Sequence, residues 1–181
     1  VLVTHYFNPP YLIPTVEVEC GEKTSDETVA TVSEFLIGMG KRPALVQKEL
    51  PGFIAVRLQF ALGREALSLV EQGAATPEDI DGILNSVLGR RWTTSGIFGF
   101  WDSAGCDLVA DTAEQVFPTL ESKTEVSPVL RQMVKDGHLG MKSGKGFYDW
   151  PPESVEATRR RNSSVLTEME KLLSRLEDNQ V

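Results

Sequence analysis

This sequence predicts an all-α domain of about six or seven helices, preceded by a short β-rich segment. Three patterns support that prediction. Residues 52–73 are apolar on more than one face at helical spacing, which is typical of a core helix. Residues 80–88 carry apolar side chains at i, i+3, i+4, i+7 and i+8, and residues 165–176 have a similar spacing. Both stretches are therefore predicted to be amphipathic helices.

The composition limits the classes of function. The chain has 181 residues, 41% hydrophobic and 24% charged, as expected for one globular domain with an appendage. The net charge of −8 argues against general binding to nucleic acid or to an anionic membrane. Cys20 and Cys106 form no pattern that suits zinc, so we expect free thiols and no metal. We expect a cytoplasmic location, with the mitochondrial matrix or peroxisome as alternatives.

The first fifty residues contain the β-rich segment. Residues 1–6 and 13–19 have the composition of strands, and Asn8-Pro9-Pro10 between them predicts a turn. The first run looks like a strand already under way, which suggests a piece of a longer protein. Thr24 and Glu27 form the pattern of a capping box, so a helix is expected from there to Gly40. Residues 44–46 fit either a strand or an extended linker.

The central helix and those after it have clear boundary signals. Pro51-Gly52 and Gly73 predict the ends of the 52–73 helix, around which we expect the other elements to pack. Its internal charged residues argue against a membrane span. Thr76-Pro77 predicts the next helix start, residues 89–92 a turn, and the later chain further helices at the following positions: 96–104, 107–117, 127–134 and 165–176.

His5 and Glu17 are the residues best suited to chemistry. They lie on the two β-rich runs, and the turn between them can bring the side chains together. A carboxylate that accepts a proton from one ring nitrogen leaves the other nitrogen free to act as a base. A structural role for His5 remains the alternative from the spacing alone.

Several short motifs together resemble the 3-hydroxyacyl-CoA dehydrogenase family. They occur in the family's order and at about its spacing over residues 1 to 150. The motifs are HYFNPP from His5, VEV around Glu17, PGFI from Pro51, EDID from Glu78, and GMKSGKGFY from Gly140. The last is not a P-loop, because Gly146 stands where that motif needs Ser or Thr.

The resemblance implies a helical C-terminal domain of the kind also found in 6-phosphogluconate dehydrogenase. Its Rossmann domain would be missing from this chain, with residues 1–18 as its end and linker, 19–150 as the helical domain, and 151–181 as an additional helix. The resemblance further implies NAD as cofactor, bound mainly by the missing domain. It assigns His5 as the catalytic base and Glu17 as its orienting acid, and places Asn8 and Lys142 near the cofactor.

The departure from the family pattern that matters most is at position 56. The family has an asparagine that hydrogen-bonds the substrate oxygen two residues after GFI, and this chain has Val56 there. A valine side chain can neither donate nor accept a hydrogen bond. The loss of one such donor typically lowers a rate by about 10²–10³-fold.

We therefore expect an NAD-dependent oxidation of L-3-hydroxyacyl-CoA to 3-ketoacyl-CoA in fatty acid β-oxidation. The isolated chain is expected to be inactive. Two alternatives remain: a relative that oxidises small hydroxy acids such as gulonate or carnitine, favoured by Val56, and a non-catalytic dimerisation module. The surplus of apolar faces also predicts a homodimer.

Overall fold

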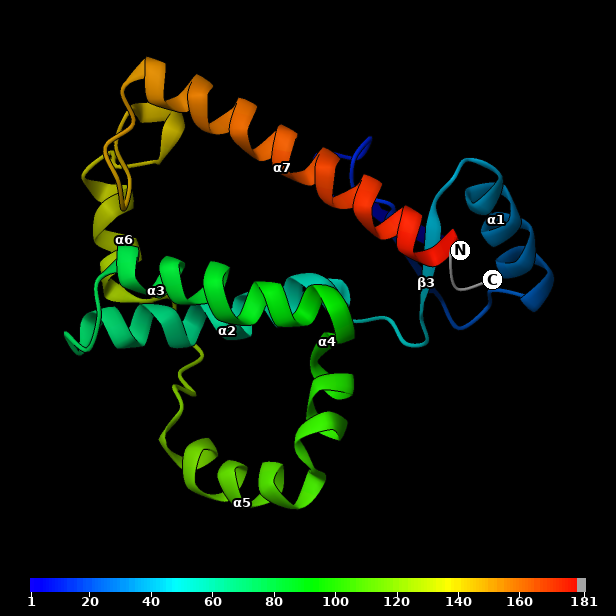
Figure 1. Cartoon of the computed structure of the whole chain (residues 1–181), viewed down its shortest axis with the longest axis horizontal. Coiled ribbons are helices and arrows are strands. Elements are labelled where there is room, and N and C mark those ends of the chain that lie inside the picture. The colour runs from blue at the N-terminus through cyan, green and yellow to red at the C-terminus, as the bar shows by residue number, and fades with distance from the viewer. Residues whose placement is uncertain (179–181) are drawn as a thin grey trace. The chain divides into compact units, whose positions relative to one another are not determined.

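A computed structural model describes residues 1–178, which form two compact units. The first unit contains residues 1–59 and the segment from residue 150 onward, and the second contains residues 60–149. Helix α2 (Phe53–Glu71) begins in the first unit and ends in the second (Figure 1). The last three residues of the predicted terminal segment lie outside the described residues.

The first unit is built on a three-stranded sheet in the order β1-β2-β3. Its strands are β1 (Leu2–Tyr6), β2 (Thr15–Cys20) and β3 (Arg42–Val46). Strand β2 pairs antiparallel with β1 and parallel with β3, so it is central. The third strand settles the alternatives left open for residues 44–46. The prediction of an all-α fold is wrong, because the β-rich segment is not a lead-in but the framework of this unit.

Alternation along β2 separates an apolar face from a polar one. Val16 and Val18 are fully buried and pack with Leu36 of α1 (Asp26–Gly38), which lies against the sheet (Figure 1). Glu17 and Glu19 point to the other face, because successive strand residues alternate. Helix α1 is capped by Ser25 rather than Thr24, since the Ser25 hydroxyl accepts the Thr28 amide proton.

The second unit is helical, and one of its helices includes a segment that was predicted to be a turn. Thr76 caps α3 through a capping box with Asp79, and Ser127 caps α6, both at the predicted starts. Residues 89–92, predicted to be a turn, lie inside a continuous run of helix, which bends only at Gly96 (φ 64°). The elements after α2 are α3 (Pro77–Ile83), the π-helix η1 (Leu84–Leu88), α4 (Gly89–Ala104), α5 (Cys106–Val116), the 3₁₀ turns η2 (Phe117–Thr119) and η3 (Met141–Ser143), and α6 (Pro128–Lys135).

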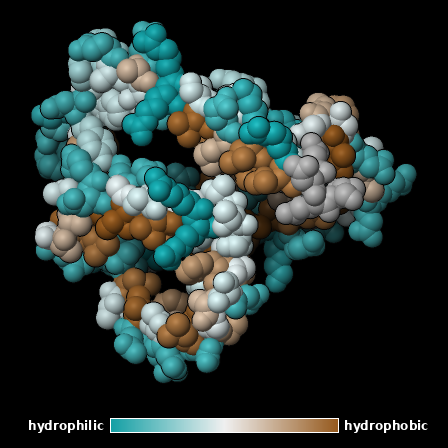
Figure 2. Space-filling model, in the orientation of Figure 1, coloured by the Kyte–Doolittle hydropathy of each residue, from teal (hydrophilic) through white to brown (hydrophobic). Residues whose placement is uncertain are grey.

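Helix α2 is present as predicted, but it is not a buried core helix in this chain. Its single buried residue is Ser68, whereas Leu58 and Phe60 are 62% and 70% exposed. Figure 2 shows apolar side chains on the visible surface of both units. The apolar faces of α2 thus exceed what the described residues cover.

Helix α7 (Pro152–Asp178) ends the described chain and belongs to the first unit. Its residues 163, 166, 167, 170, 173 and 174 form the less exposed face, and the Glu170 carboxylate pairs with Arg42 of β3 at 3.8 Å. Within the described residues, none of the helices combines the length and apolar character that a membrane span requires.

Candidate active site

His5 and Glu17 face each other across the β1–β2 ladder. They are partners in the strand register, and the His5 Nδ1 to Glu17 Oε2 distance is 2.9 Å. The Glu17 side chain is only 4% exposed, whereas that of His5 is 27% exposed. Because the carboxylate binds Nδ1, the proton is held on that nitrogen and the His5 Nε2 keeps its lone pair. The pair can therefore accept a proton from a bound molecule.

The second carboxylate oxygen of Glu17 holds the start of α2. Glu17 Oε1 accepts the backbone amide protons of Ile54 at 3.0 Å and of Ala55 at 2.8 Å. A helix N-terminus carries unpaired amides and a partial positive charge, so it is a favourable partner for a buried carboxylate. Both oxygens of Glu17 are thus occupied, and its orientation toward His5 is set by the backbone of α2.

Two aromatic rings enclose the imidazole. Phe53 stacks on His5 with ring centroids 4.6 Å apart and an interplanar angle of 21°, and Phe7 approaches edge-on at 4.7 Å. Phe53 adopts a φ of 51°, which is rare for a residue with a side chain. A left-handed conformation costs roughly 1–2 kcal/mol for such a residue. Strain of this kind is kept where neighbouring contacts hold it, and here it places the ring against His5.

The contribution of Phe53 was not predicted from the sequence. Pro51-Gly52 predicted the entry to a helix, but no role was expected for the residue that follows. The signal was available, since a Pro-Gly pair predicts a turn with a positive φ and so a sharp change of direction before the helix. The ring stack itself depends on strand pairing and could not be read from local sequence.

The other predicted site residues occupy different places. Asn8 is exposed in the turn after β1, three residues beyond His5. Val56 is half-buried in the first turn of α2, directly after the two amides that hold Glu17. Lys142 is exposed in η3 of the second unit. The roles of Asn8, Val56 and Lys142 at substrate or cofactor stay predictions.

The loop that carries Lys142 is closed by its own contacts. The Ser143 hydroxyl accepts the Leu139 amide proton at 2.8 Å and donates toward the carbonyl of Gly140 or Lys145. Gly146 lies so close to Gly140 that an added Cβ would meet its Cα at 2.8 Å. The glycines are needed for this close approach of two backbone segments, which is a structural reason for the motif.

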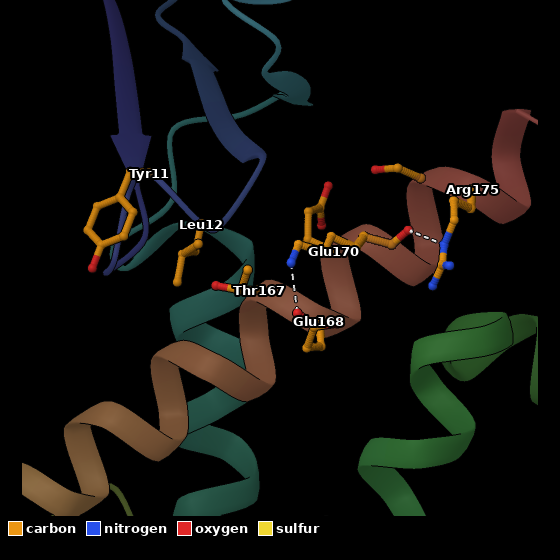
Figure 3. A pocket seen from close by; sticks show the side chains of 8 residues that line it. Tyr11, Leu12, Thr167, Glu168, Glu170 and Arg175 are labelled. Atoms are coloured by element: carbon orange, nitrogen blue, oxygen red, sulfur yellow. Dashed lines mark hydrogen bonds and ion pairs between the residues drawn. The ribbon is translucent and has the colours of Figure 1, made fainter.

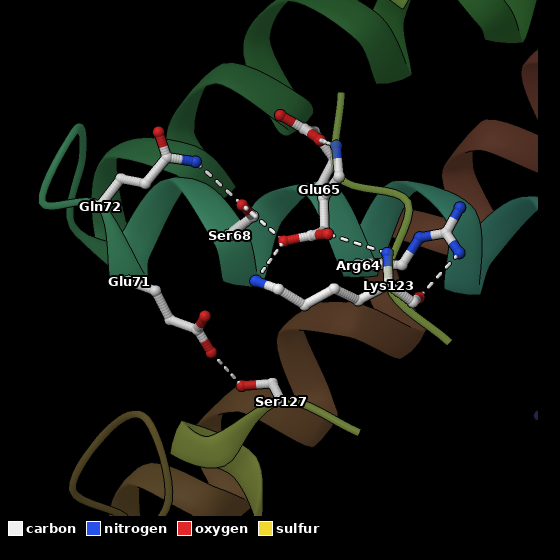
Figure 4. Close-up of polar contacts among 8 residues, drawn as sticks. Arg64, Glu65, Ser68, Glu71, Gln72, Lys123 and Ser127 are labelled. Atoms are coloured by element: carbon white, nitrogen blue, oxygen red, sulfur yellow. Dashed lines mark hydrogen bonds and ion pairs between the residues drawn. The ribbon is translucent and has the colours of Figure 1, made fainter. Parts of the chain in front are cut away.

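A separate polar cluster lies on the second half of α2. Glu65 Oε2 accepts the Glu121 amide proton at 2.7 Å, and Glu121 in turn accepts the amide and side-chain protons of Lys123 (Figure 4). The hydrogen bonds from Lys123 lower the pKa of Glu121 to about 2. Ser68, Glu71 and Arg64 add further contacts to residues 121–127. The cluster attaches this loop to the helix and, unlike the pair at Glu17, contains no histidine.

A surface groove of about 550 Å³ lies between α7 and Tyr11-Leu12 (Figure 3). Its charged residues contact one another: Lys171 Nζ is 2.8 Å from Glu168 Oε1, and Arg175 Nε donates to the Lys171 carbonyl. The groove contains none of the residues around His5. Among the residues that the structure describes, no cluster of three or more His, Cys, Asp or Glu side chains could hold a metal ion.

This chain matches two domain families that belong to the same kind of enzyme. Residues 52–150 match the 3-hydroxyacyl-CoA dehydrogenase C-terminal domain, and residues 1–50 match the NAD-binding domain of the same enzymes. Both matched domains are those of one family of NAD-binding dehydrogenases. The chain belongs to the 3-hydroxyacyl-CoA dehydrogenase family, as the motifs had indicated.

The similar proteins differ in the substrates that their names give. The chain is 33% identical over 169 residues to 5-formyl-3-hydroxy-2-methylpyridine 4-carboxylate 5-dehydrogenase of Mesorhizobium japonicum, covering 93% of this chain and 55% of that one. It is 38% identical over 172 residues to L-carnitine dehydrogenase of Burkholderia mallei, covering 93% and 52%. The chain therefore spans about half the length of these curated relatives.

A solved structure gives the same picture of the fold. The crystal structure of an NAD+-dependent dismutase, 5-formyl-3-hydroxy-2-methylpyridine 4-carboxylic acid 5-dehydrogenase, superposes with a TM-score of 0.93 at 32% identity. The alignment covers 96% of this chain and 56% of that chain.

These matches correct the prediction that the nucleotide-binding domain is missing. Residues 1–50, with their sheet and α1, correspond to a part of that domain. The prediction was wrong because residues 1–18 were assigned as only the end of that domain and its linker, although residues 1–50 match it. These residues contain strands of the domain but not its glycine-rich turn, which follows another strand of such domains. The pairing of β1, β2 and β3 could not be predicted from local patterns. NAD is supported as the cofactor by the match and by the NAD+-dependent structure.

Proposed function

We propose that this chain is part of an NAD-dependent dehydrogenase that acts on a small carboxylate-bearing substrate rather than on an acyl-CoA thioester. The observation that carries the choice is Val56. It occupies the first turn of α2, beside the amides that hold Glu17, where the family has an asparagine for the substrate oxygen. A thioester substrate would lose that hydrogen bond.

The names of the similar proteins support the same choice. The two relatives that cover 93% of this chain act, by name, on a pyridine carboxylate and on carnitine. Neither name includes coenzyme A. A small substrate with a carboxylate can be oriented by charge elsewhere in the pocket, so it depends less on a donor at position 56.

His5 is the base in this proposal. A substrate hydroxyl would donate its proton to His5 Nε2 while its carbon loses hydride. Glu17 stabilises the imidazolium that forms, because its Oε2 is 2.9 Å from Nδ1. Phe53 and Phe7 shield the ring from water, which strengthens the interaction between the two charges.

In this proposal one end of NAD lies beside Asn8. The cofactor supplies the hydride acceptor when it is bound. Asn8 is exposed three residues after His5, and its amide can both donate and accept hydrogen bonds, as recognition of a nicotinamide carboxamide requires. The printed sequence holds no G-x-G-x-x-G motif, so the usual cradle for the pyrophosphate is not among these residues.

Oxidation of 3-hydroxyacyl-CoA is the second candidate function. It is favoured by the match of residues 52–150 to the C-terminal domain of those enzymes. In that case Val56 makes the protein a slow member of the family.

Turnover by the full-length protein separates the two candidates. NADH formation would be measured with carnitine, gulonate and 3-hydroxybutyryl-CoA, and NADH production or loss with the pyridine aldehyde carboxylate. Higher kcat/KM for one of the small acids supports the proposal, whereas efficient thioester turnover with none of the acids overturns it. In a Val56→Asn variant we expect thioester turnover to rise by about 10²–10³-fold. No change on that substitution would remove Val56 as the reason for the preference.

We also propose a homodimer, because the apolar side chains of α2 have too few partners among the described residues. Leu58 and Phe60 are mostly exposed, and surfaces of this kind usually mark an interface. Sedimentation of the full-length protein at micromolar concentration should show a dimer, and a monomer there would contradict the proposal. The cytoplasmic location stays a prediction.

A further inference from the structure

Strand β2 contains a second buried carboxylate that the mechanism above does not use. Glu19 is 7% exposed and lies two residues after Glu17, so both side chains leave the same face of the strand. A buried carboxylate needs hydrogen-bond donors to offset its lost hydration. For Glu19 that donor is the Leu50 backbone amide, 2.8 Å from its Oε1.

Leu50 is the first residue of the turn that leads into α2. The Phe53 amide donates to the Leu50 carbonyl at 3.0 Å, and Gly52 has a φ of 85°. This is the pattern of a four-residue turn with Pro-Gly at its centre. Phe53 closes the turn in its left-handed conformation and places its ring on His5.

The two carboxylates therefore hold opposite ends of one short segment. Glu19 binds the amide of Leu50 before the turn, and Glu17 binds the amides of Ile54 and Ala55 after it. Phe53 lies between these fixed points. Its unfavourable backbone conformation is kept only while both ends are held, because either end could otherwise relax toward an ordinary φ.

We propose that Glu19 is a positioning residue for the His5–Glu17 pair: it holds the Leu50–Phe53 turn, and the turn holds Phe53 against the imidazole. Glu19 contacts no reacting atom in this scheme. Its effect reaches His5 through Phe53, and the consequence for turnover rests on the proposed function of His5 as the base.

The test uses the full-length protein with three substitutions. Glu19→Met keeps a similar volume and removes the acceptor, whereas Glu19→Gln keeps an oxygen that can accept the Leu50 amide proton. Val46→Ala is the matched control, since Val46 is a buried neighbour of Glu19 in the β2–β3 register but has no role in holding the turn.

The first measurement does not need a substrate. Stacking on Phe53 shifts the His5 ring proton signals in the NMR spectrum, so we expect those signals to move in Glu19→Met and to stay in place in Glu19→Gln and Val46→Ala. The second measurement is kinetic. We expect kcat to fall about tenfold in Glu19→Met with KM within about twofold, and to recover in Glu19→Gln, because small misplacements of catalytic groups act mainly on kcat.

Unchanged His5 signals in a folded Glu19→Met protein overturn the proposal, whatever the activity. If that variant does not fold, Glu19→Asp replaces it, since its carboxylate is one methylene too short for Leu50. The same His5 shift is then required. Shifted signals without turnover of any hydroxy acid by the parent protein would support the positioning role and count against the proposed function instead.

Discussion

In the first unit Glu17 binds an imidazole and two helix amides, whereas in the second unit Glu65 and Glu121 accept protons from loop residues and from the Ser68 hydroxyl of α2. Both arrangements place carboxylates against one end of α2. They differ in the atoms that a ligand could contact. His5 keeps a free ring nitrogen on a side chain that is 27% exposed, whereas the Glu121 carboxylate is hydrogen-bonded by its own neighbours. A buried carboxylate therefore indicates a reactive site only where its partner still offers an atom to a ligand.

The largest effect is expected from removing His5. In His5→Ala, kcat should fall by about 10⁴-fold because the proton acceptor is lost. Steady-state kinetics of the full-length protein measure this, and His138→Ala, the same change at the other histidine, is the matched control. Equal losses in the two variants would contradict the assignment of the base.

A smaller loss of activity is expected from Glu17→Gln. The new amide oxygen can still accept the α2 amide protons, but its NH₂ group faces Nδ1 and moves the imidazole proton to Nε2. We expect kcat to fall by about 10²–10³-fold with little change in the unfolding midpoint. In the second unit Glu121→Gln should leave kcat unchanged. A similar kcat loss in both variants would remove the distinction between the two clusters.

The Glu121 cluster should instead affect stability against acid. The pKa of the Glu121 carboxyl is lowered from 4.5 to about 2. Its contribution to folding stability is therefore complete above the unfolded value of 4.5, and is lost as pH falls from 4.5 through about 2. The urea midpoint of the parent protein should exceed that of Glu121→Gln at neutral pH, and the difference should shrink over that range. Glu168→Gln, at an exposed ion pair of α7, serves as the control with a smaller effect. A difference that does not depend on pH would contradict the role of the ionised carboxylate.

The smallest effect is expected at Tyr148, whose hydroxyl donates to Asp81 Oδ2 at 2.7 Å and joins two of the family motifs within the second unit. Burial and this hydrogen bond raise the pKa of Tyr148 to about 12. Tyr148→Phe should lower the free energy of unfolding by about 1 kcal/mol. That contribution is present below the unfolded pKa near 10 and is lost as pH rises through 12. Tyr11→Phe, at an exposed tyrosine, should change nothing, and equal effects would argue against the Asp81 bond.

Local patterns predicted most of the helices because their caps act within one turn of chain. Thr76 with Asp79 and Ser127 with Pro128 begin helices where the sequence indicated. The errors occurred where local preferences were overridden. Residues 89–92 carry a glycine and two arginines yet continue a helix, and Thr24 lost the cap position to Ser25 because its hydroxyl binds the Val1 carbonyl instead.

The candidate pair was also found from sequence, as two titratable residues on adjacent β-rich runs joined by a short turn. Their contact is a short-range consequence of antiparallel pairing. The anchoring of Glu17 by α2 involves residues 37 and 38 positions away, and the Glu19–Leu50 bond spans 31 positions. No periodicity or motif carries information about pairings of that range.

The amino-acid sequence alone was sufficient for the family, for the existence of most helices, and for the His5–Glu17 pair, because each depends mainly on residues close along the chain. The sheet as the framework of the first unit, the left-handed Phe53 on the imidazole, and the different uses of carboxylates at the two ends of α2 were decided by folding. They arise when strand pairing brings distant segments together, and backbone amides then become the partners that local sequence cannot name.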